Sequence, residues 1–187
     1  MVRRLKHHEQ KLLRKVDFLT YKSDNNHRAA TIRARYHLTG TLDYEKYNRL
    51  AGSARQLAHK LSNLDPSDPF RKQLESQMLD KFYDMGILKQ NREQGVGLSA
   101  IERDVTVSAF ARRRLGVVMK RIGMVENVAA AVKFIEQGHV RVGTEVITDS
   151  AFLVTRNMED FVTWVDSSKI KRNIMQYREK LDDFELL

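Results

Sequence analysis

Hydrophobic residues in the first half of the chain recur every three or four positions, the spacing that places side chains on one face of an α-helix. Two regular runs predict helices over residues 44–61 and 69–85, and weaker patterns predict helices over 5–19 and 29–36. The inward-facing positions predicted in the two regular runs are Tyr44, Tyr47, Ala51, Ala54, Ala58, Leu61, Phe70, Leu74, Met78, Phe82 and Met85.

Helix-boundary residues support these limits. Asp68 can cap the helix that starts at Pro69, where a missing N–H costs little, and Gly86 is suited to the left-handed position that ends a helix. Residues 89–107 contain two glycines and show poor periodicity, so we predict a linker there.

The second half predicts two helices followed by short strands. Ser108 is a candidate cap for a helix with Leu115, Val118, Met119 and Ile122 on its buried face. Gly123 would end this helix, and Asn127 would cap another that ends at Gly138 in a left-handed conformation. The inward positions predicted for this helix are Val128, Ala131, Val132 and Ile135.

Alternation of apolar and polar residues then predicts a β-hairpin. Val140, Val142 and Val146 alternate with polar neighbours, and Gly143-Thr144 fits a two-residue turn. Short strands are predicted at 152–154 and 161–165, and a terminal helix at 170–181.

The predicted fold class is therefore α+β. A basic helical region over residues 1–88 is followed by the linker over 89–107. A small helix–helix–hairpin domain over 108–165 follows, with a C-terminal helix and acidic tail over 166–187.

The charge of the chain points to a polyanionic partner. Lys and Arg number 33 against 24 Asp and Glu, a formal net charge of +9. The excess is concentrated in two blocks: residues 1–60 carry 14 basic and 5 acidic side chains, and residues 108–141 carry 7 and 2. Nucleic acid is the favoured partner, with an acidic membrane surface as the less frequent alternative.

Other compositional features restrict the location and chemistry. Cysteine is absent, which excludes disulfides and thiolate metal sites. No apolar run approaches the length of a membrane span, and the first residues lack the apolar stretch of a signal peptide, so we expect a soluble, intracellular chain without a membrane partner. The sequence has no GxSxG or HExxH motif and scattered histidines, so neither catalysis, a metal site nor a cofactor is predicted.

Three consecutive arginines are the main binding candidates. On a helix, Arg112, Arg113 and Arg114 would span about 200° and could not act together, so one or two should face the partner and another a local carboxylate. His139 has two readings of similar weight: its imidazole caps a helix terminus, or it binds phosphate or sugar. The full set of predicted RNA-binding residues is Arg112, Arg113, Arg114, Lys120, Arg121, Lys133, His139, Arg141, Arg3, Arg4, Lys6, Lys11, Arg14 and Lys15.

Residues 110–165 resemble a known RNA-binding module. The segments RRRL at 112–115, AAAV at 129–132 and GHVRVG at 138–143 are similar to the domain named after small-subunit ribosomal protein S4. This resemblance implies binding of structured RNA through an alpha-L type of fold.

Flanking segments extend the resemblance over nearly the whole chain. Residues 5–13, 68–71, 79–86 and 155–166 are similar to the eukaryotic nucleolar branch of this family, a component of the U3 small nucleolar ribonucleoprotein. The resemblance implies a nucleolar factor of the small-subunit processome that binds U3 small nucleolar RNA. It also implies promotion of U3 pairing with pre-rRNA for early cleavages leading to 18S rRNA, and association with an M-phase phosphoprotein and other processome proteins.

The chain departs from the ribosomal pattern at two places. The hairpin turn has Gly143-Thr144-Glu145 without the usual lysine, and Val125-Glu126-Asn127 replaces a Ser-Arg pair at the second helix. Because Glu126 repels phosphate, we expect the N-terminal basic block to share the RNA contact. No GxxxxGK[ST] loop indicates a motor, so annealing would be passive.

Two alternative functions are consistent with the sequence. One is a mature small-subunit ribosomal protein of the same family. The other is a mainly protein-binding scaffold that docks through helices 43–61 and 69–85. An RNA-modifying enzyme is disfavoured because 187 residues leave no room for a catalytic domain.

Overall fold

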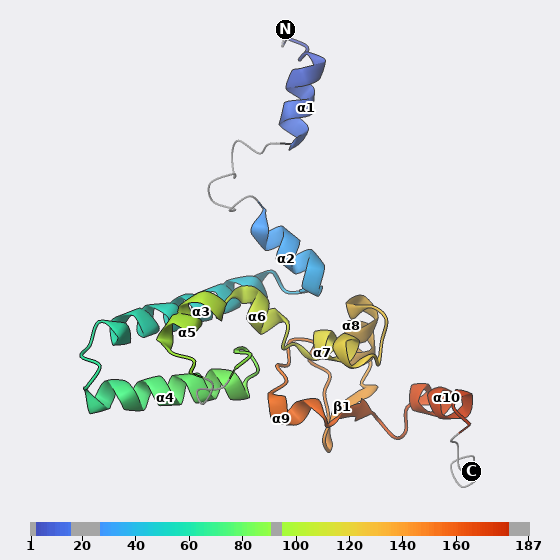
Figure 1. Cartoon of the computed structure of the whole chain (residues 1–187). Coiled ribbons are helices and arrows are strands. Elements are labelled where there is room, and N and C mark those ends of the chain that lie inside the picture. Colours follow the sequence, from blue (N-terminus) through green and yellow to red (C-terminus); the bar gives the residue numbers. More distant parts are fainter. Residues whose placement is uncertain (1–2, 16–26, 91–94, 180–187) are drawn as a thin grey trace.

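The computed structural model describes residues 3–15, 27–90 and 95–179 (Figure 1). The chain forms a helical N-terminal region and a smaller helix-and-sheet unit beside it. The helices of the first region are α1 His7–Lys15, α2 Arg28–Tyr36, α3 Thr41–Ser62, α4 Pro69–Asp84, α5 Leu98–Asp104 and α6 Val107–Ala111. The second unit contains α7 Leu115–Ile122, α8 Val128–Glu136, β1 Val140–Val142, β2 Glu145–Val146, α9 Arg156–Glu159, β3 Val162–Trp164 and α10 Lys169–Tyr177. This arrangement confirms the predicted α+β class.

Two hydrophobic cores correspond to these two parts. Residues of α2 to α6 form the first core, in which the rings of Tyr47 and Phe110 stack with centroids 5.8 Å apart. Residues of α7, α8, β1 and β3 form the second, where Leu115, Met119 and Ile135 are fully buried. The boundary between the cores therefore falls at residues 112–114.

The first core contains most of the predicted inward positions. Tyr47, Ala51, Ala58 and Leu61 of α3 are buried, and the Asp68 side chain accepts a hydrogen bond of 3.0 Å from the Phe70 N–H, as expected of a cap. On α4 the predicted face is correct except at its start. Phe70 is 58% exposed because it lies in the first turn of α4, beyond the core, whereas Leu79 is buried.

The linker prediction for residues 89–107 is wrong over its second half. Residues 98–104 form α5, which packs along α3 with Leu98 and Ile101 buried. Val107 starts the short helix α6, whose residues belong to the first core rather than to the second unit. The segment is too short to show helical periodicity, and its burial depends on α3, which lies far away in the sequence.

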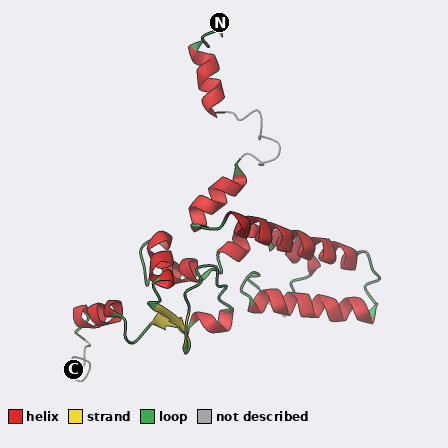
Figure 2. Ribbon diagram, turned by 180° about the vertical axis from the view of Figure 1, so that it is seen from behind, coloured by secondary structure: helices red, strands yellow, loops and turns green. Residues whose placement is uncertain are grey.

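The second unit has a small antiparallel sheet of order β2-β1-β3, shown in yellow in Figure 2. Val142 pairs with Glu145, so Gly143 and Thr144 form the predicted two-residue turn, and Gly143 has φ 64°. Helices α7 and α8 pack closely at Gly116, where an added Cβ would lie 3.4 Å from Val132. Gly138 adopts the predicted left-handed conformation, and Gly123, which was predicted to end α7, is left-handed as well.

Four local predictions in the second unit are corrected. Ser108 lies inside α6 and is not a helix cap. Residues 152–154 form a single bridge to Arg114 instead of a strand. Helix α7 starts only at Leu115. Ile122 is 45% exposed because it lies in the last turn of α7, past the packed surface.

Both ends of the chain are only partly described. Helix α1 starts at His7 rather than at residue 5, and its Leu12 and Leu13 are exposed. The predicted positions 16–19 fall outside the described residues. Helix α10 buries no residue completely, and Tyr177 is 91% exposed; the predicted position 181 is outside the described residues. None of the described helices is long and apolar enough to cross a membrane.

Gly86 provides a test of how the two parts meet. It has φ +70°, and a Cβ added there would lie 2.7 Å from the guanidinium carbon of Arg113. We expect Gly86→Ala to lower the free energy of unfolding by about 2 kcal/mol, from backbone strain and displacement of Arg113. Urea denaturation followed by circular dichroism measures this change.

Gly52→Ala is the matched control. Gly52 lies within α3 with no atom close to an added Cβ, so alanine should leave stability unchanged or raise it by up to about 1 kcal/mol. Equal effects of the two substitutions would contradict the close contact at Gly86.

Candidate nucleic-acid interface

The three consecutive arginines lie in the turn between α6 and α7, not on a helix. Their backbone pairs with residues 152–154: the Leu115 N–H donates to the Phe152 carbonyl at 2.9 Å, and the Val154 N–H donates to the Arg113 carbonyl at 2.8 Å. This pairing directs consecutive side chains to different sides. The prediction that the three cannot act together is correct, but the reason is a turn that buries Arg113 and Arg114, not their spacing on one helix.

Arg113 points into the protein and is 4% exposed. Its Nε donates to the Val154 carbonyl at 2.9 Å, and its Nη1 donates to Glu159 Oε2 at 3.1 Å. Burial lowers the pKa of the Arg113 guanidinium from its ordinary value, and the hydrogen bond that Arg113 donates to Glu159 opposes that shift. The Arg113 side chain therefore holds α9 against the turn between α6 and α7.

Arg114 is 2% exposed and connects the two parts of the chain. Its Nη1 donates to Asp43 Oδ2 at 2.8 Å and to the Tyr47 hydroxyl at 3.3 Å, both on α3. Burial also raises the pKa of Tyr47 above its ordinary value, with Arg114 acting in the opposite direction. Because Arg114 directly precedes α7, this ion pair fixes the second unit to α3.

The predicted RNA contacts of Arg113 and Arg114 are therefore corrected. A buried guanidinium that is committed to an internal carboxylate is not available to phosphate. Arg112 is the exposed member of the three. Sequence alone did not reveal this division, because Asp43 and Glu159 are 71 and 46 residues away from their partners.

Arg156 is a structural residue that the sequence reading missed. It reaches from α9 to the end of α4, where Nε donates to the Tyr83 carbonyl at 2.8 Å and Nη2 to the Leu88 carbonyl at 2.6 Å. Its guanidinium also lies 4.2 Å from the centroid of the Tyr83 ring. A cation at the carboxyl end of a helix interacts favourably with the helix dipole, so Arg156 stabilises the contact between α9 and the end of α4.

The hairpin cations are also engaged within the chain. Arg141 Nε donates to Thr163 Oγ1 at 3.1 Å, and its Nη1 pairs with Asp166, which Lys171 also contacts at 2.6 Å. Lys171 and Arg141 hold the pKa of Asp166 below its ordinary value. Arg141 is half-buried, so only part of its guanidinium is open to a partner.

His139 does not itself cap a helix, but it contacts the residue that does. Its Nδ1 lies 3.1 Å from the Ser168 hydroxyl, and Ser168 caps α10 by accepting from the Ile170 N–H at 3.2 Å. The imidazole also packs edge-on against Phe134. The contact with the cap residue favours positioning of α10, and a contact of His139 with phosphate is untested.

The remaining predicted cations form the candidate interface. Arg112, Lys120 and Lys133 are exposed, and within the described residues no salt bridge engages them. Arg121 is half exposed and contacts Glu159, which it shares with Arg113. Lys120 lies on α7 and Lys133 on α8, the two helices that pack together in the second unit.

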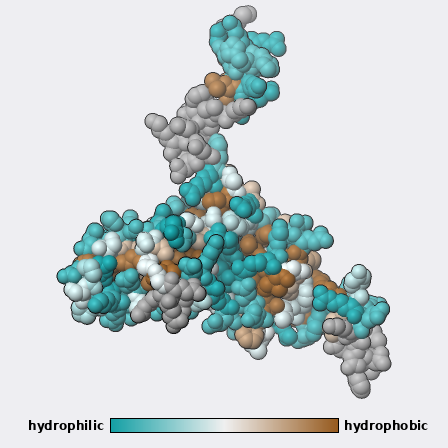
Figure 3. Space-filling model, viewed as in Figure 1, coloured by the Kyte–Doolittle hydropathy of each residue, from teal (hydrophilic) through white to brown (hydrophobic). Residues whose placement is uncertain are grey.

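The N-terminal candidates are exposed as well. Arg4, Lys6, Lys11 and Arg14 are open to solvent, while Arg3 pairs with Glu9 at 2.6 Å. The Lys15 side chain lies outside the described part of the structure. The face seen in Figure 3 is mainly hydrophilic around the smaller brown patches, as suits a surface for a charged partner.

Exposed cations on α3 are a further feature that the sequence reading did not select. Lys46, Arg49 and Lys60 are exposed on this helix, which also carries Asp43 and Tyr47, the partners of Arg114. Helical periodicity could have identified them, since they lie outside the predicted inward positions. Within the described residues, no group of three or more His, Asp or Glu is arranged to hold a metal ion.

Comparison with protein families divides the chain in the same way as its cores. The "Ribosomal protein S4/S9 N-terminal domain" family matches residues 4–103, and the "S4 domain" family matches residues 113–160. The first match covers more than half of the chain.

Individual proteins match over the full length. The chain is 56% identical to the U3 small nucleolar ribonucleoprotein protein IMP3 of Saccharomyces cerevisiae, over 99% of both chains. It is 49% identical to the human protein of the same name, over 100% of this chain and 99% of the relative. The small ribosomal subunit protein uS4 of Metallosphaera sedula is 29% identical over 64% of this chain and 63% of its own length.

The Arg114–Asp43 pair can be tested by a double-mutant cycle. Arg114→Met leaves Asp43 without its partner, and we expect it to lower the free energy of unfolding by about 3 kcal/mol. Asp43→Asn should act in the same direction, and the double variant should show a coupling of about 1–3 kcal/mol between the two side chains. Chemical denaturation of all four proteins measures the cycle.

Arg112→Met is the matched control for this cycle. Because Arg112 is exposed, the change should stay within about 0.5 kcal/mol. Additive effects of the two single substitutions would show that the ion pair does not join α3 to the second unit.

Proposed function

The chain belongs to the family of U3 small nucleolar ribonucleoprotein IMP3 proteins, and we propose that it is an RNA-binding factor in the assembly of the small ribosomal subunit. Within that role, it binds U3 small nucleolar RNA and promotes the pairing of U3 with pre-rRNA for the early cleavages leading to 18S rRNA. It acts in the nucleolus with an M-phase phosphoprotein and other processome proteins.

The observation that supports this proposal is a set of exposed cations on and next to the S4-type domain, for which the described residues provide no salt-bridge partner. Arg112, Lys120 and Lys133 remain exposed after the internal carboxylates have engaged Arg113, Arg114 and part of Arg121. Arginine can bind a phosphate through two parallel hydrogen bonds, and lysine adds a point charge. A-form RNA presents its backbone and 2′-hydroxyls, so these groups suit recognition of shape rather than of base sequence.

The same charges support a passive mechanism of pairing. Two RNA strands repel each other through their phosphates, and a protein that contacts both lowers this repulsion. The exposed cations of α1 and those of α7 and α8 belong to separate parts of the chain, so each group can contact a different RNA segment. Arg114 holds the second unit against α3, and this placement limits the directions from which the two RNA segments can approach each other.

The mature ribosomal protein remains the competing function. The similarity to small-subunit protein uS4 covers 64% of the chain, whereas the similarity to the IMP3 proteins covers all of it. Sedimentation separates the two: an assembly factor should be found in large precursors, and a mature subunit component in translating ribosomes.

Salt dependence tests the proposed interface. We expect the binding of U3 RNA to be weaker in a variant that combines Arg112→Gln, Lys120→Gln and Lys133→Gln. The slope of log affinity against log salt concentration should fall in magnitude by about 2, because each lost phosphate contact lowers that slope by roughly 0.7–0.9. The melting temperature should be unchanged because all three side chains are exposed.

Lys72→Gln with Lys81→Gln is the control. Both lysines are exposed on α4, outside the candidate interface, and the slope should change little. An unaltered slope in the triple variant would place the RNA on another surface.

Annealing is tested directly by mixing labelled U3 and pre-rRNA fragments and following duplex formation by fluorescence transfer. We expect the protein to raise the rate, and the triple variant to lose most of the increase. Equal rates with and without the wild-type chain would contradict the annealing role while leaving RNA binding intact.

A further inference from the structure

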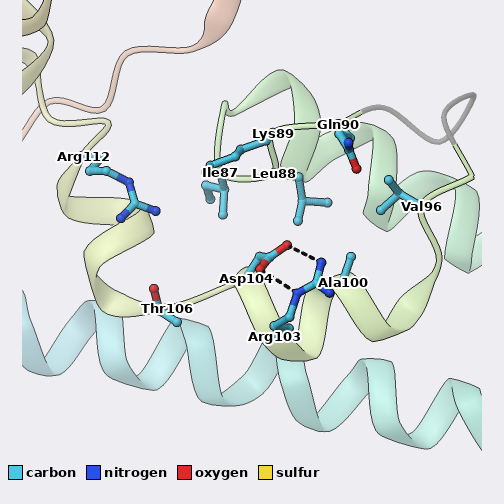
Figure 4. A pocket seen from close by; sticks show the side chains of 10 residues that line it. All are labelled: Ile87, Leu88, Lys89, Gln90, Val96, Ala100, Arg103, Asp104, Thr106 and Arg112. Carbon is cyan, nitrogen blue, oxygen red and sulfur yellow. Dashed lines mark hydrogen bonds and ion pairs between the residues drawn. The ribbon is translucent and has the colours of Figure 1, made fainter.

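A cavity of about 440 Å³ lies at the edge of the first core, between the loop after α4 and helix α5 (Figure 4). Its apolar lining comes from Ile87, Leu88, Val96 and Ala100. Figure 4 shows Ile87 and Leu88 pointing from the loop toward the opposite wall, which α5 forms. The volume is within the range of about 300–1,000 Å³ that is typical of ligand sites.

Charged groups surround this apolar floor. Lys89, Arg103 and Arg112 line the cavity, with Asp104 as its acidic residue. Arg103 binds Asp104 with two hydrogen bonds of 3.0 and 3.2 Å. Lys89 and Arg112 keep the remaining positive charge, so the rim of the cavity attracts an anion.

Asp104 remains an acceptor in this setting. The hydrogen bond from Arg103 lowers the pKa of the Asp104 carboxyl, and the charges of Arg103, Lys89 and Arg112 lower it further, against a small effect of burial. The carboxylate is therefore ionised at neutral pH. Since Arg103 holds it in place, its remaining lone pairs are directed and available to a donor.

We propose that this cavity holds one unstacked nucleotide of a single-stranded RNA, with the base over the apolar floor and its phosphate at Lys89 and Arg112. The inference rests on the proposed RNA-binding function and specifies one site within it. Base faces are flat and apolar and can pack on apolar side chains, whereas the edges of splayed bases carry groups that proteins read by hydrogen bonds. Asp104 accepts from the amino group of cytosine, adenine or guanine, a group that uracil lacks.

Asp104 also favours RNA over an acidic peptide. A peptide carboxylate seated in the cavity would face the Asp104 carboxylate, whereas a nucleotide separates its negative phosphate from the amino donors of its base. Arg112 links the cavity to the candidate interface, because the same exposed side chain borders the cavity and belongs to that interface.

The experiment uses the full chain and a short single-stranded RNA that carries 2-aminopurine at one position. The described residues that line the cavity include no aromatic ring, so a base that leaves its stack to enter it should increase in fluorescence. Ala100→Met fills the cavity and should abolish the increase and lower the affinity for this RNA about tenfold. Affinity for a duplex RNA, which has no unstacked base, should stay unchanged.

Four further variants complete the test. Ser99→Met adds the same side chain at an exposed position of α5 and should behave as wild type. Lys89→Gln leaves the core intact and should also lower the single-strand affinity, unlike Lys72→Gln on α4, so the inference stays testable if Ala100→Met fails to fold. Asp104→Asn should reduce the preference for cytidine-rich over uridine-rich RNA.

The possible outcomes are distinct. Normal duplex binding with a fluorescence increase that neither Ala100→Met nor Lys89→Gln affects would overturn the cavity site alone. Failure of the wild-type chain to bind either RNA would overturn the proposed function and this site with it. Loss of protein-partner binding in Ala100→Met, with single-strand binding unchanged, would assign the cavity to a peptide and also overturn the inference.

Discussion

The architecture depends on two arginines that carry their charge into the boundary between the two cores. Arg114 extends to Asp43 on α3, and Arg113 extends to Glu159 on α9. Removing charge from water is unfavourable unless a partner compensates for it, so each ion pair admits few arrangements of the elements that carry it. One nitrogen of each guanidinium has no hydrogen-bond partner in the described part of the chain, which makes both pairs sensitive to displacement.

This constraint also divides the basic residues by purpose. Side chains at the boundary, including Arg156 at the end of α4, serve to position elements, and their charges are neutralised or held against carbonyls. Arg112, Lys120 and Lys133 stay on the surface and keep a full positive charge for a partner. A variant of the first kind should alter RNA binding only through folding, whereas a variant of the second kind should alter it without a change in stability.

The position of Arg112 connects three features of the molecule. Its backbone continues the turn that orients Arg113 and Arg114, while its side chain lies beside both the cavity of α5 and the candidate interface. Single-stranded and duplex segments of one RNA could thus be held at neighbouring sites. Such an arrangement suits a factor that brings two RNAs together, because pairing begins at unstacked nucleotides next to bound structure.

Much of the fold followed from the sequence because its signals are local. Periodicity located α3, α4 and α8, and glycines with left-handed φ angles set the ends of α4 and α7 and the hairpin turn. The prediction failed where tertiary contacts decide. Helix α5 is too short to show a pattern, residues 152–154 pair with Arg114 rather than with the sheet, and Phe70 lies beyond the core that its spacing suggested.

The binding residues could also be predicted from the sequence only as far as local signals reach. Composition and motif determined that this chain carries an excess of cations on an RNA-binding type of domain, since charge and short-range patterns are properties of the chain itself. Only the tertiary structure decided which of three adjacent arginines is free. That choice depends on carboxylates 71 and 46 residues away, and their approach is set by packing and desolvation rather than by sequence spacing.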